Sequence, residues 1–107
     1  MSTYNTQNIF ARIISGSIKA DIVLEDDRCL AFYDIAPKAA IHVIIIPKLA
    51  CVDFEDFLSK EPDSRYFFDF ILKVAKTLNV SHYKLQTNKG ANAGQEIMHF
   101  HVHLLAS

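Results

Sequence analysis

The pattern of hydrophobic and polar positions predicts a small antiparallel sheet. Five segments have either the alternation or the continuous apolar character of β-strands: residues 22–24, 29–33, 41–46, 83–86 and 98–105. The charged turn at residues 25–28 joins the first two segments into a predicted hairpin. The third segment is apolar on both faces and ends at Pro47, which is typical of a buried central strand.

Two other segments have a helical period. Asn8 is placed to cap a short helix with apolar side chains at positions 9, 10, 13 and 14, and Gly16 ends it. A longer helix is predicted with Pro62 in its first turn, Ser59 as a candidate cap and its end near Asn79. Five strands and two helices, mostly in hairpin order, predict an α+β fold with the helices on one side of the sheet.

Composition narrows the class of protein. A chain of 107 residues, 50% hydrophobic and 21% charged, predicts a single folded domain over residues 1–107. A net charge of -1 argues against broad binding to nucleic acid or to an anionic membrane. Cys29 and Cys51 lie in no disulfide-rich pattern, and the chain shows neither a signal peptide nor a membrane-spanning run. These features predict a cytoplasmic protein.

The last predicted strand carries the candidate chemistry. His99, His101 and His103 recur every second residue, so their side chains fall on one face of an extended chain, at steps of about 6.6 Å. Such a row suits zinc coordination, or a nucleophilic imidazole whose neighbours fix its tautomer and stabilise an anion. The Gly- and Asn-rich loop at residues 88–95 offers backbone N–H groups, which favours a phosphate over a metal.

The stretch from His99 to Leu105 reads His-φ-His-φ-His-φ-φ, with φ apolar, and resembles the signature of the histidine triad family. Residues throughout most of the chain are similar to the nucleotide-binding branch of that family: Ile9, Phe10, residues 25–32, Asp34, Ile35, Pro37, His42, residues 46–48, Asn88, Gly94 and Gln95. The resemblance implies a HIT-like fold, with a five-stranded antiparallel sheet and two helices.

A homodimer is expected on two grounds. Helix 62–79 carries more apolar surface than one sheet can cover, including some of Tyr66, Phe67, Phe70 and Leu72. The strand at residues 83–86 also offers an open edge. The resemblance implies the same arrangement, in which two sheets pair into one of ten strands.

The family resemblance also implies a role for each site residue. His101 would attack the α-phosphorus of a purine nucleotide, His103 would contact the α-phosphate, and His99 with His42 would support the His101 tautomer. Asp34 would accept the ribose hydroxyls. The other nucleotide-binding positions form a phosphate loop and an apolar base pocket: Asn88, Gly94, Gln95 and the backbone N–H of Glu96, then Ile9, Phe10, Ile13, Ile18, Phe32 and Ile35.

The activity implied is that of a hydrolase or nucleotidyl transferase, for example a phosphoramidase that releases AMP through a covalent nucleotidyl-His101, with no cofactor required. Two other classes stay open: a nucleotide-binding scaffold with incidental turnover, and a zinc protein that uses the histidine row. Zinc is not favoured, because Leu49 and Ala50 follow Lys48 where one branch has a histidine two residues after Pro-Lys.

Overall fold

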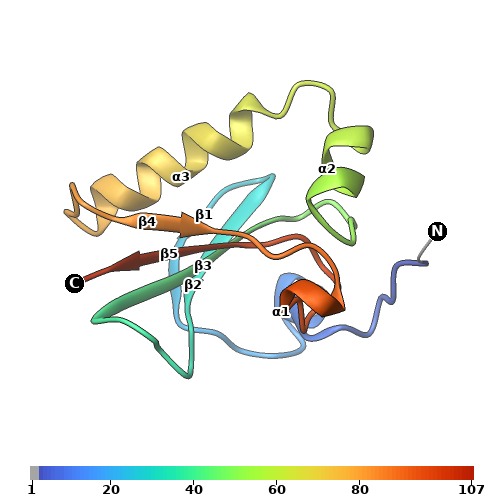
Figure 1. The fold of residues 1–107 in the computed structure, drawn as a ribbon, viewed down its shortest axis with the longest axis horizontal. Helices are drawn as coiled ribbons and strands as arrows, with labels where there is room; N and C mark the ends of the chain where they lie inside the picture. The colour runs from blue at the N-terminus through green and yellow to red at the C-terminus, as the bar shows by residue number, and fades with distance from the viewer. Residues whose placement is uncertain (1–2) are drawn as a thin grey trace.

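The computed structural model describes residues 3–107, and a five-stranded sheet forms its centre (Figure 1). The strands lie in the order β1-β2-β3-β5-β4, and every neighbouring pair is antiparallel. Their bounds are Ile22–Glu25 for β1, Cys29–Tyr33 for β2, Ile41–Pro47 for β3, Lys84–Gln86 for β4 and Val102–Ala106 for β5. The antiparallel five-stranded sheet predicted from the sequence is therefore confirmed.

The strand predicted over residues 98–105 pairs along only part of that length. Its ladder with β3 begins at Val102, and the residues before it are held by other partners. The Phe100 N–H donates to the Cys51 carbonyl at 2.9 Å, and the His101 carbonyl accepts from Thr87 Oγ1 at 2.7 Å. The alternation of faces still holds, because Phe100 packs in the same core as Val102.

Both predicted helices are confirmed, and the second is shorter than predicted. Helix α1 spans Ile9–Ile14, and the Asn8 side chain accepts the Ala11 N–H at its start. The long helix, α3, spans Arg65–Thr77, so it begins after Pro62 rather than with it. A further helix, α2, spans Phe54–Lys60 and was not predicted.

Helix α2 has a reciprocal cap at its start. The Asp53 side chain accepts the Asp56 N–H at 2.9 Å, and the Asp56 carboxylate accepts the Val52 N–H at 2.8 Å. Two acids three residues apart, ahead of an apolar pair of side chains, carry this signal in the sequence. Of the helices in the described part of the chain, none is both long and apolar enough to cross a membrane.

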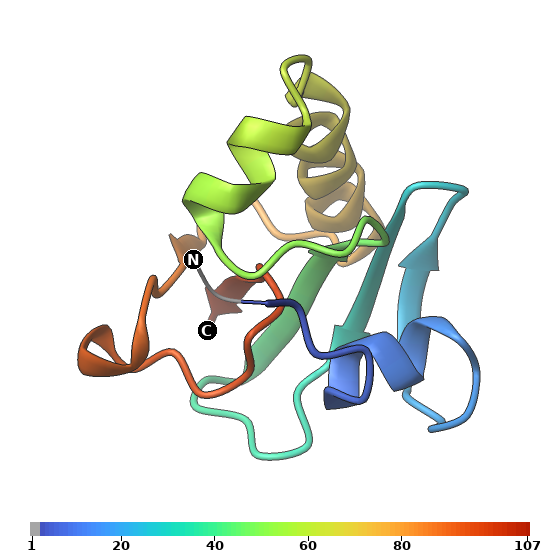
Figure 2. The same ribbon diagram turned by 90° about the vertical axis from the view of Figure 1, so that its right-hand side faces the viewer.

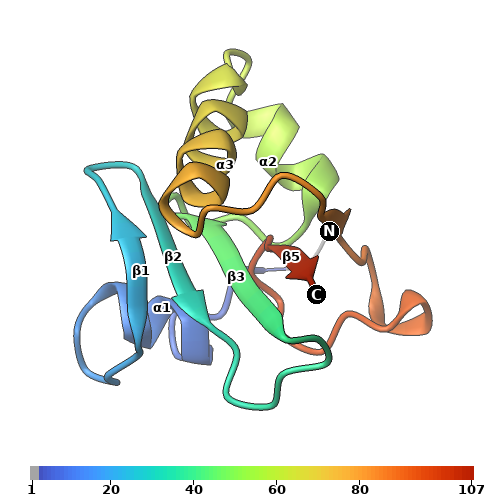
Figure 3. The same ribbon diagram turned by 90° about the vertical axis from the view of Figure 1, so that its left-hand side faces the viewer.

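The helices cover both faces of the sheet, which corrects the expectation of helices on one side. Helices α2 and α3 lie on one face, and α1 lies on the other (Figures 1 and 2). Strands β2 and β3 lie in the middle of the sheet and bury side chains toward both layers (Figure 3). Phe10 of α1 completes the second core, which also contains Leu30, Phe32, Ile44 and Ile46.

The outer face of α3 differs from the one expected. Phe67 and Phe70 are buried against the sheet, together with Ile71 and Val74 at helical spacing. The apolar side chains that stay exposed on this helix are Phe68 and Leu72, while Tyr66 is partly buried.

Candidate active site

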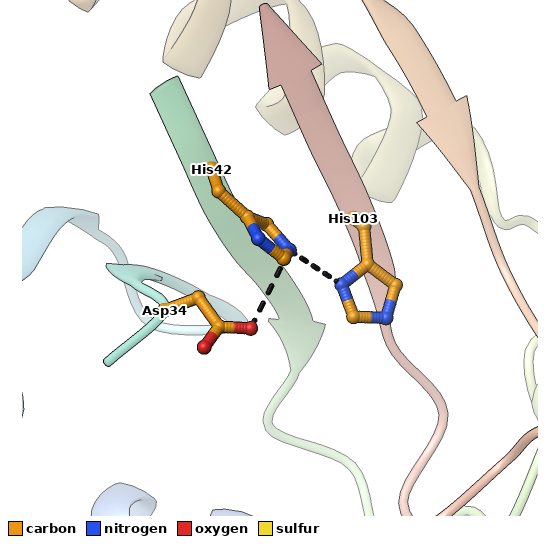
Figure 4. Close-up of side chains that lie close together, drawn as sticks. All are labelled: Asp34, His42 and His103. Atoms are coloured by element: carbon orange, nitrogen blue, oxygen red, sulfur yellow. Dashed lines mark hydrogen bonds and ion pairs between the residues drawn. The ribbon is translucent and has the colours of Figure 1, made fainter. Parts of the chain in front are cut away.

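Three of the expected site residues meet on the α1 face of the sheet (Figure 4). His42 lies on β3 and His103 on β5, and His42 Nε2 is 2.9 Å from His103 Nδ1. Asp34 follows β2 and places Oδ2 at 3.4 Å from His42 Nε2. The chain thus places a carboxylate next to a hydrogen-bonded pair of imidazoles.

The backbone fixes the tautomers in this group. The Lys38 N–H donates to His42 Nδ1 at 3.1 Å, so the proton of neutral His42 lies on Nε2. His42 Nε2–H in turn donates to His103 Nδ1, which leaves the His103 proton on Nε2. Burial, together with the neighbouring His101 and His42, lowers the pKa of His103 to about 4, so this histidine is neutral near pH 7. His103 therefore presents an N–H donor.

His101 presents the complementary group. Its Nδ1 lies 2.7 Å from the His99 carbonyl, and since a carbonyl only accepts, Nδ1 carries the proton. Nε2 therefore holds a lone pair. Burial lowers the pKa of His101, which keeps the ring neutral. The ring packs edge-on against Phe10 and His103, with ring centroids 4.9 and 5.0 Å away.

His99 supports this arrangement through its backbone, whereas support from its ring was expected. The ring is fully buried and points elsewhere: Nε2–H donates to the Pro47 carbonyl at 2.8 Å, and Nδ1 accepts from Tyr4 Oη at 2.6 Å. His42 likewise bonds to His103 and not to His101. Tyr4 was missed by sequence reasoning, because its partner lies 95 residues away along the chain.

Replacing Tyr4 with phenylalanine should lower the free energy of unfolding by about 1–2 kcal/mol, because His99 Nδ1 loses its donor inside the core. Urea unfolding followed by circular dichroism measures this change. Tyr33→Phe is the matched control, since Tyr33 is exposed at the end of β2. Equal stability of the two variants would show that the Tyr4 hydroxyl does not hold His99.

The stability of the fold should also depend on pH through His99. Burial lowers the pKa of His99 to about 4, against 6.5 in an unfolded chain. Below pH 6.5 the unfolded chain therefore binds a proton that the folded one does not. The free energy of unfolding should fall by about 1.4 kcal/mol per pH unit as the pH drops from 6.5 toward 4. A denaturation midpoint that is constant between pH 5 and 7 would contradict this.

The positions expected around the base divide into buried and exposed residues. Phe10 and Phe32 are buried and pack edge-on, with their ring centroids 5.6 Å apart. Ile9 is exposed, and Ile35 is 98% exposed beside Asp34. Phe10 thus forms an apolar wall next to His101, and Ile35 stands at the surface where a ligand can reach it.

The expected phosphate loop holds itself together with its own side chains. Gln95 is buried; its Nε2 donates to the Val52 carbonyl at 2.8 Å, and its Oε1 accepts the Gly90 N–H at 2.8 Å. Asn88 Nδ2 donates to the Ala93 carbonyl at 2.7 Å. Gly94 has a φ of 93°, which favours glycine. Glu96 is exposed. These contacts shape the backbone of the loop.

The group in the described residues that could hold a metal includes one histidine of the row, His103, together with two residues outside the row. The ring nitrogens of His99 are both engaged, by Tyr4 and by Pro47. The donor atoms of Asp34, His42 and His103 lie within 4.8 Å of one another. An ion there would have to displace the hydrogen bond between His42 and His103.

Comparison with known proteins gives the family. Residues 15–107 match the HIT domain. An uncharacterized HIT-like protein of Rickettsia prowazekii is 43% identical over 106 residues, which are 95% of this chain and 88% of the relative. A solved structure named as a HIT-like protein has a TM-score of 0.89 at 42% identity, covering 94% of this chain and 99% of that one. A HIT family hydrolase from Clostridium thermocellum has a TM-score of 0.85 at 34% identity, covering 96% and 92%. The chain therefore belongs to the HIT domain family.

Proposed function

We propose that this protein hydrolyses or transfers the nucleotidyl group of a purine nucleotide, with nucleoside phosphoramidates as substrates. The observation that carries the proposal is the pairing of His101 and His103: a neutral imidazole with its lone pair on Nε2 lies beside one that carries its proton on Nε2. A nucleophile next to an N–H donor suits attack on phosphorus, where negative charge must be stabilised.

The reaction proceeds in two displacements. His101 Nε2 attacks the α-phosphorus and forms an N–P bond while the P–N bond to the leaving amine breaks. The amine takes that electron pair and a proton from solvent. Water then attacks phosphorus and gives a proton back to solvent, the bond to His101 breaks, and AMP is released with neutral His101 restored. An acceptor alcohol or amine in place of water gives transfer.

The surrounding residues position the nucleotide. His103 Nε2–H donates to an α-phosphate oxygen, and the chain from Lys38 N–H through His42 keeps that proton in place. The loop holding Asn88, Gly94, Gln95 and Glu96 supports the phosphate with backbone N–H groups. Ile9, Phe10, Phe32 and Ile35 surround the base.

Asp34 binds the ribose hydroxyls. Asp34→Asn should therefore weaken the binding of AMP more than that of dAMP, since the missing hydroxyl leaves a carboxylate unpaired only in the wild type. Dissociation constants from equilibrium dialysis give the comparison. Equal losses for the two sugars would remove Asp34 from this role.

The protein acts as a homodimer in the cytoplasm. Phe68 and Leu72 on α3 and Leu85 on the edge strand β4 are exposed apolar side chains, which a second copy can cover. Pairing of two β4 edges would join the sheets into one of ten strands. Cys29 and Cys51 are free and buried, which fits a reducing compartment.

The experiment that tests the proposed activity is hydrolysis of adenosine 5′-phosphoramidate by protein purified without a histidine tag. AMP and ammonia should appear in equal amounts, and the rate should be unchanged by a chelator. Its pH profile should have an acid limb whose midpoint lies below 6.5, because burial lowers the pKa of His101 and a protonated imidazole cannot attack. Absence of AMP release would refute the proposal.

A further inference from the structure

A hollow of about 460 Å³ lies at the end of β4 and β5 and is lined by three basic side chains, Lys38, His82 and Lys84. The other lining residues are Ala39, Leu105, Ala106 and Ser107, so no carboxylate side chain lines the hollow. Neither the nucleophile nor the expected nucleotide contacts are among these residues.

The hollow directly adjoins the histidines. Leu105 of β5 pairs with His42 of β3 on one side and with Lys84 of β4 on the other, so these three side chains form a row on the face that carries His103. Lys38 reaches the same group, since its N–H binds His42 Nδ1 and its positive charge contributes to the lowered pKa of His103.

The position of the hollow at one end of the histidine row relates it to the expected path of the substrate. Along the chain His101, His103 and Leu105 follow one another on the same face, with Phe10 against His101 at one end and the hollow at Leu105 at the other. A nucleotide with its base near Phe10 and its α-phosphate between His101 and His103 directs its remaining phosphorus substituent past His103. That substituent is the leaving group.

We propose that this hollow is the leaving-group subsite and that it selects phosphoramidates whose departing amine carries a negatively charged group. This inference rests on the proposed function. The positive charges of Lys38 and Lys84 outnumber the one carboxylate at the hollow, the main-chain carboxylate of Ser107, so the hollow attracts an anion and repels an ammonium group. Asp34, the acid at His42, has its two oxygens directed to the Ala36 N–H and to His42 Nε2.

Three adenosine 5′-phosphoramidates of similar size test the selectivity: those of β-alanine, of β-alanine amide and of 1,3-diaminopropane. Their leaving amines carry a carboxylate, a neutral amide and an ammonium group. We expect kcat/KM to be about tenfold higher for the carboxylate than for the amide, and lowest for the ammonium compound, since each exposed charge pair contributes only modestly. The preference should shrink as salt is added.

Charge reversal locates the subsite. In the double variant Lys38→Glu, Lys84→Glu, the ratio of kcat/KM for the carboxylate to that for the amide should fall at least about tenfold. Lys73→Glu is the matched control, because Lys73 lies exposed on α3, outside the hollow, and the wild-type ratio should persist. A wild-type ratio near one, or a ratio that survives the double reversal, overturns the subsite while the proposed function stands. Failure to hydrolyse these three compounds alone also overturns the subsite, and failure to hydrolyse the unsubstituted phosphoramidate as well overturns both.

Discussion

Replacing His101 with alanine is expected to abolish turnover, with a loss of at least about 10⁴-fold in kcat. The reason is that, among the described residues, no other group at the site has a free Nε2 lone pair and also contacts Phe10 and His103. AMP should still bind near the wild-type dissociation constant, since the nucleophile contributes mainly in the transition state. Release of AMP and equilibrium dialysis measure the two effects separately.

Two other variants serve as comparisons for that loss. His103→Ala should cost about 10²-fold, as expected for one donor to a developing negative charge. Lys73→Ala should keep the wild-type rate, because Lys73 is exposed on α3 and lies outside the hydrogen-bonded histidines and the hollow. A pure, tag-free His101→Ala protein with the wild-type rate would remove His101 from the mechanism.

A negative charge at Phe70 is expected to unfold the domain, whereas the same change at Leu72 should leave it folded and split the dimer. Phe70 is 2% exposed in the core beneath α3, and a buried unpaired carboxylate there costs more than about 4 kcal/mol. Leu72 is 52% exposed, two residues further along the helix. Circular dichroism and sedimentation of Phe70→Glu and Leu72→Glu give the comparison.

A different result would contradict the expectation for each of these two variants. A folded Phe70→Glu protein would show that the packing of α3 against the sheet is not as described. A wild-type chain that sediments as a monomer at tens of micromolar would end the dimer proposal, and so would a Leu72→Glu protein that stays dimeric under the same conditions.

The sheet and the face of the histidines could be predicted because both follow from local periodicity. Alternation along the segment from Phe100 to Leu104 puts apolar side chains in the core and imidazoles opposite, whether or not each residue joins the ladder. The apolar character of β3 on both faces likewise predicted its central place. The local pattern is enough to predict a strand and its two faces where every second side chain must be buried.

The rest depended on contacts that are distant in sequence. Helix α3 was predicted to begin with Pro62, yet a separate helix, α2, takes up the chain as far as Lys60, and α3 begins only at Arg65 after a short link. The ring of His99 was expected to support His101, but Tyr4 and Pro47 take both of its nitrogens. The hydrogen-bond partner of a buried imidazole depends on how separate segments of the chain pack together. The periodicity of the sequence alone does not predict that partner.

The central claim is a covalent nucleotidyl intermediate on His101, and trapping it is the most direct measurement. Tag-free protein mixed with an adenosine phosphoramidate and quenched in denaturant within one turnover should gain the mass of one adenylyl group per chain. Peptide mapping under mildly alkaline conditions should place that group on His101, and His101→Ala should gain nothing. AMP release at the wild-type rate with no adduct, or with the adduct on another residue, would contradict the account.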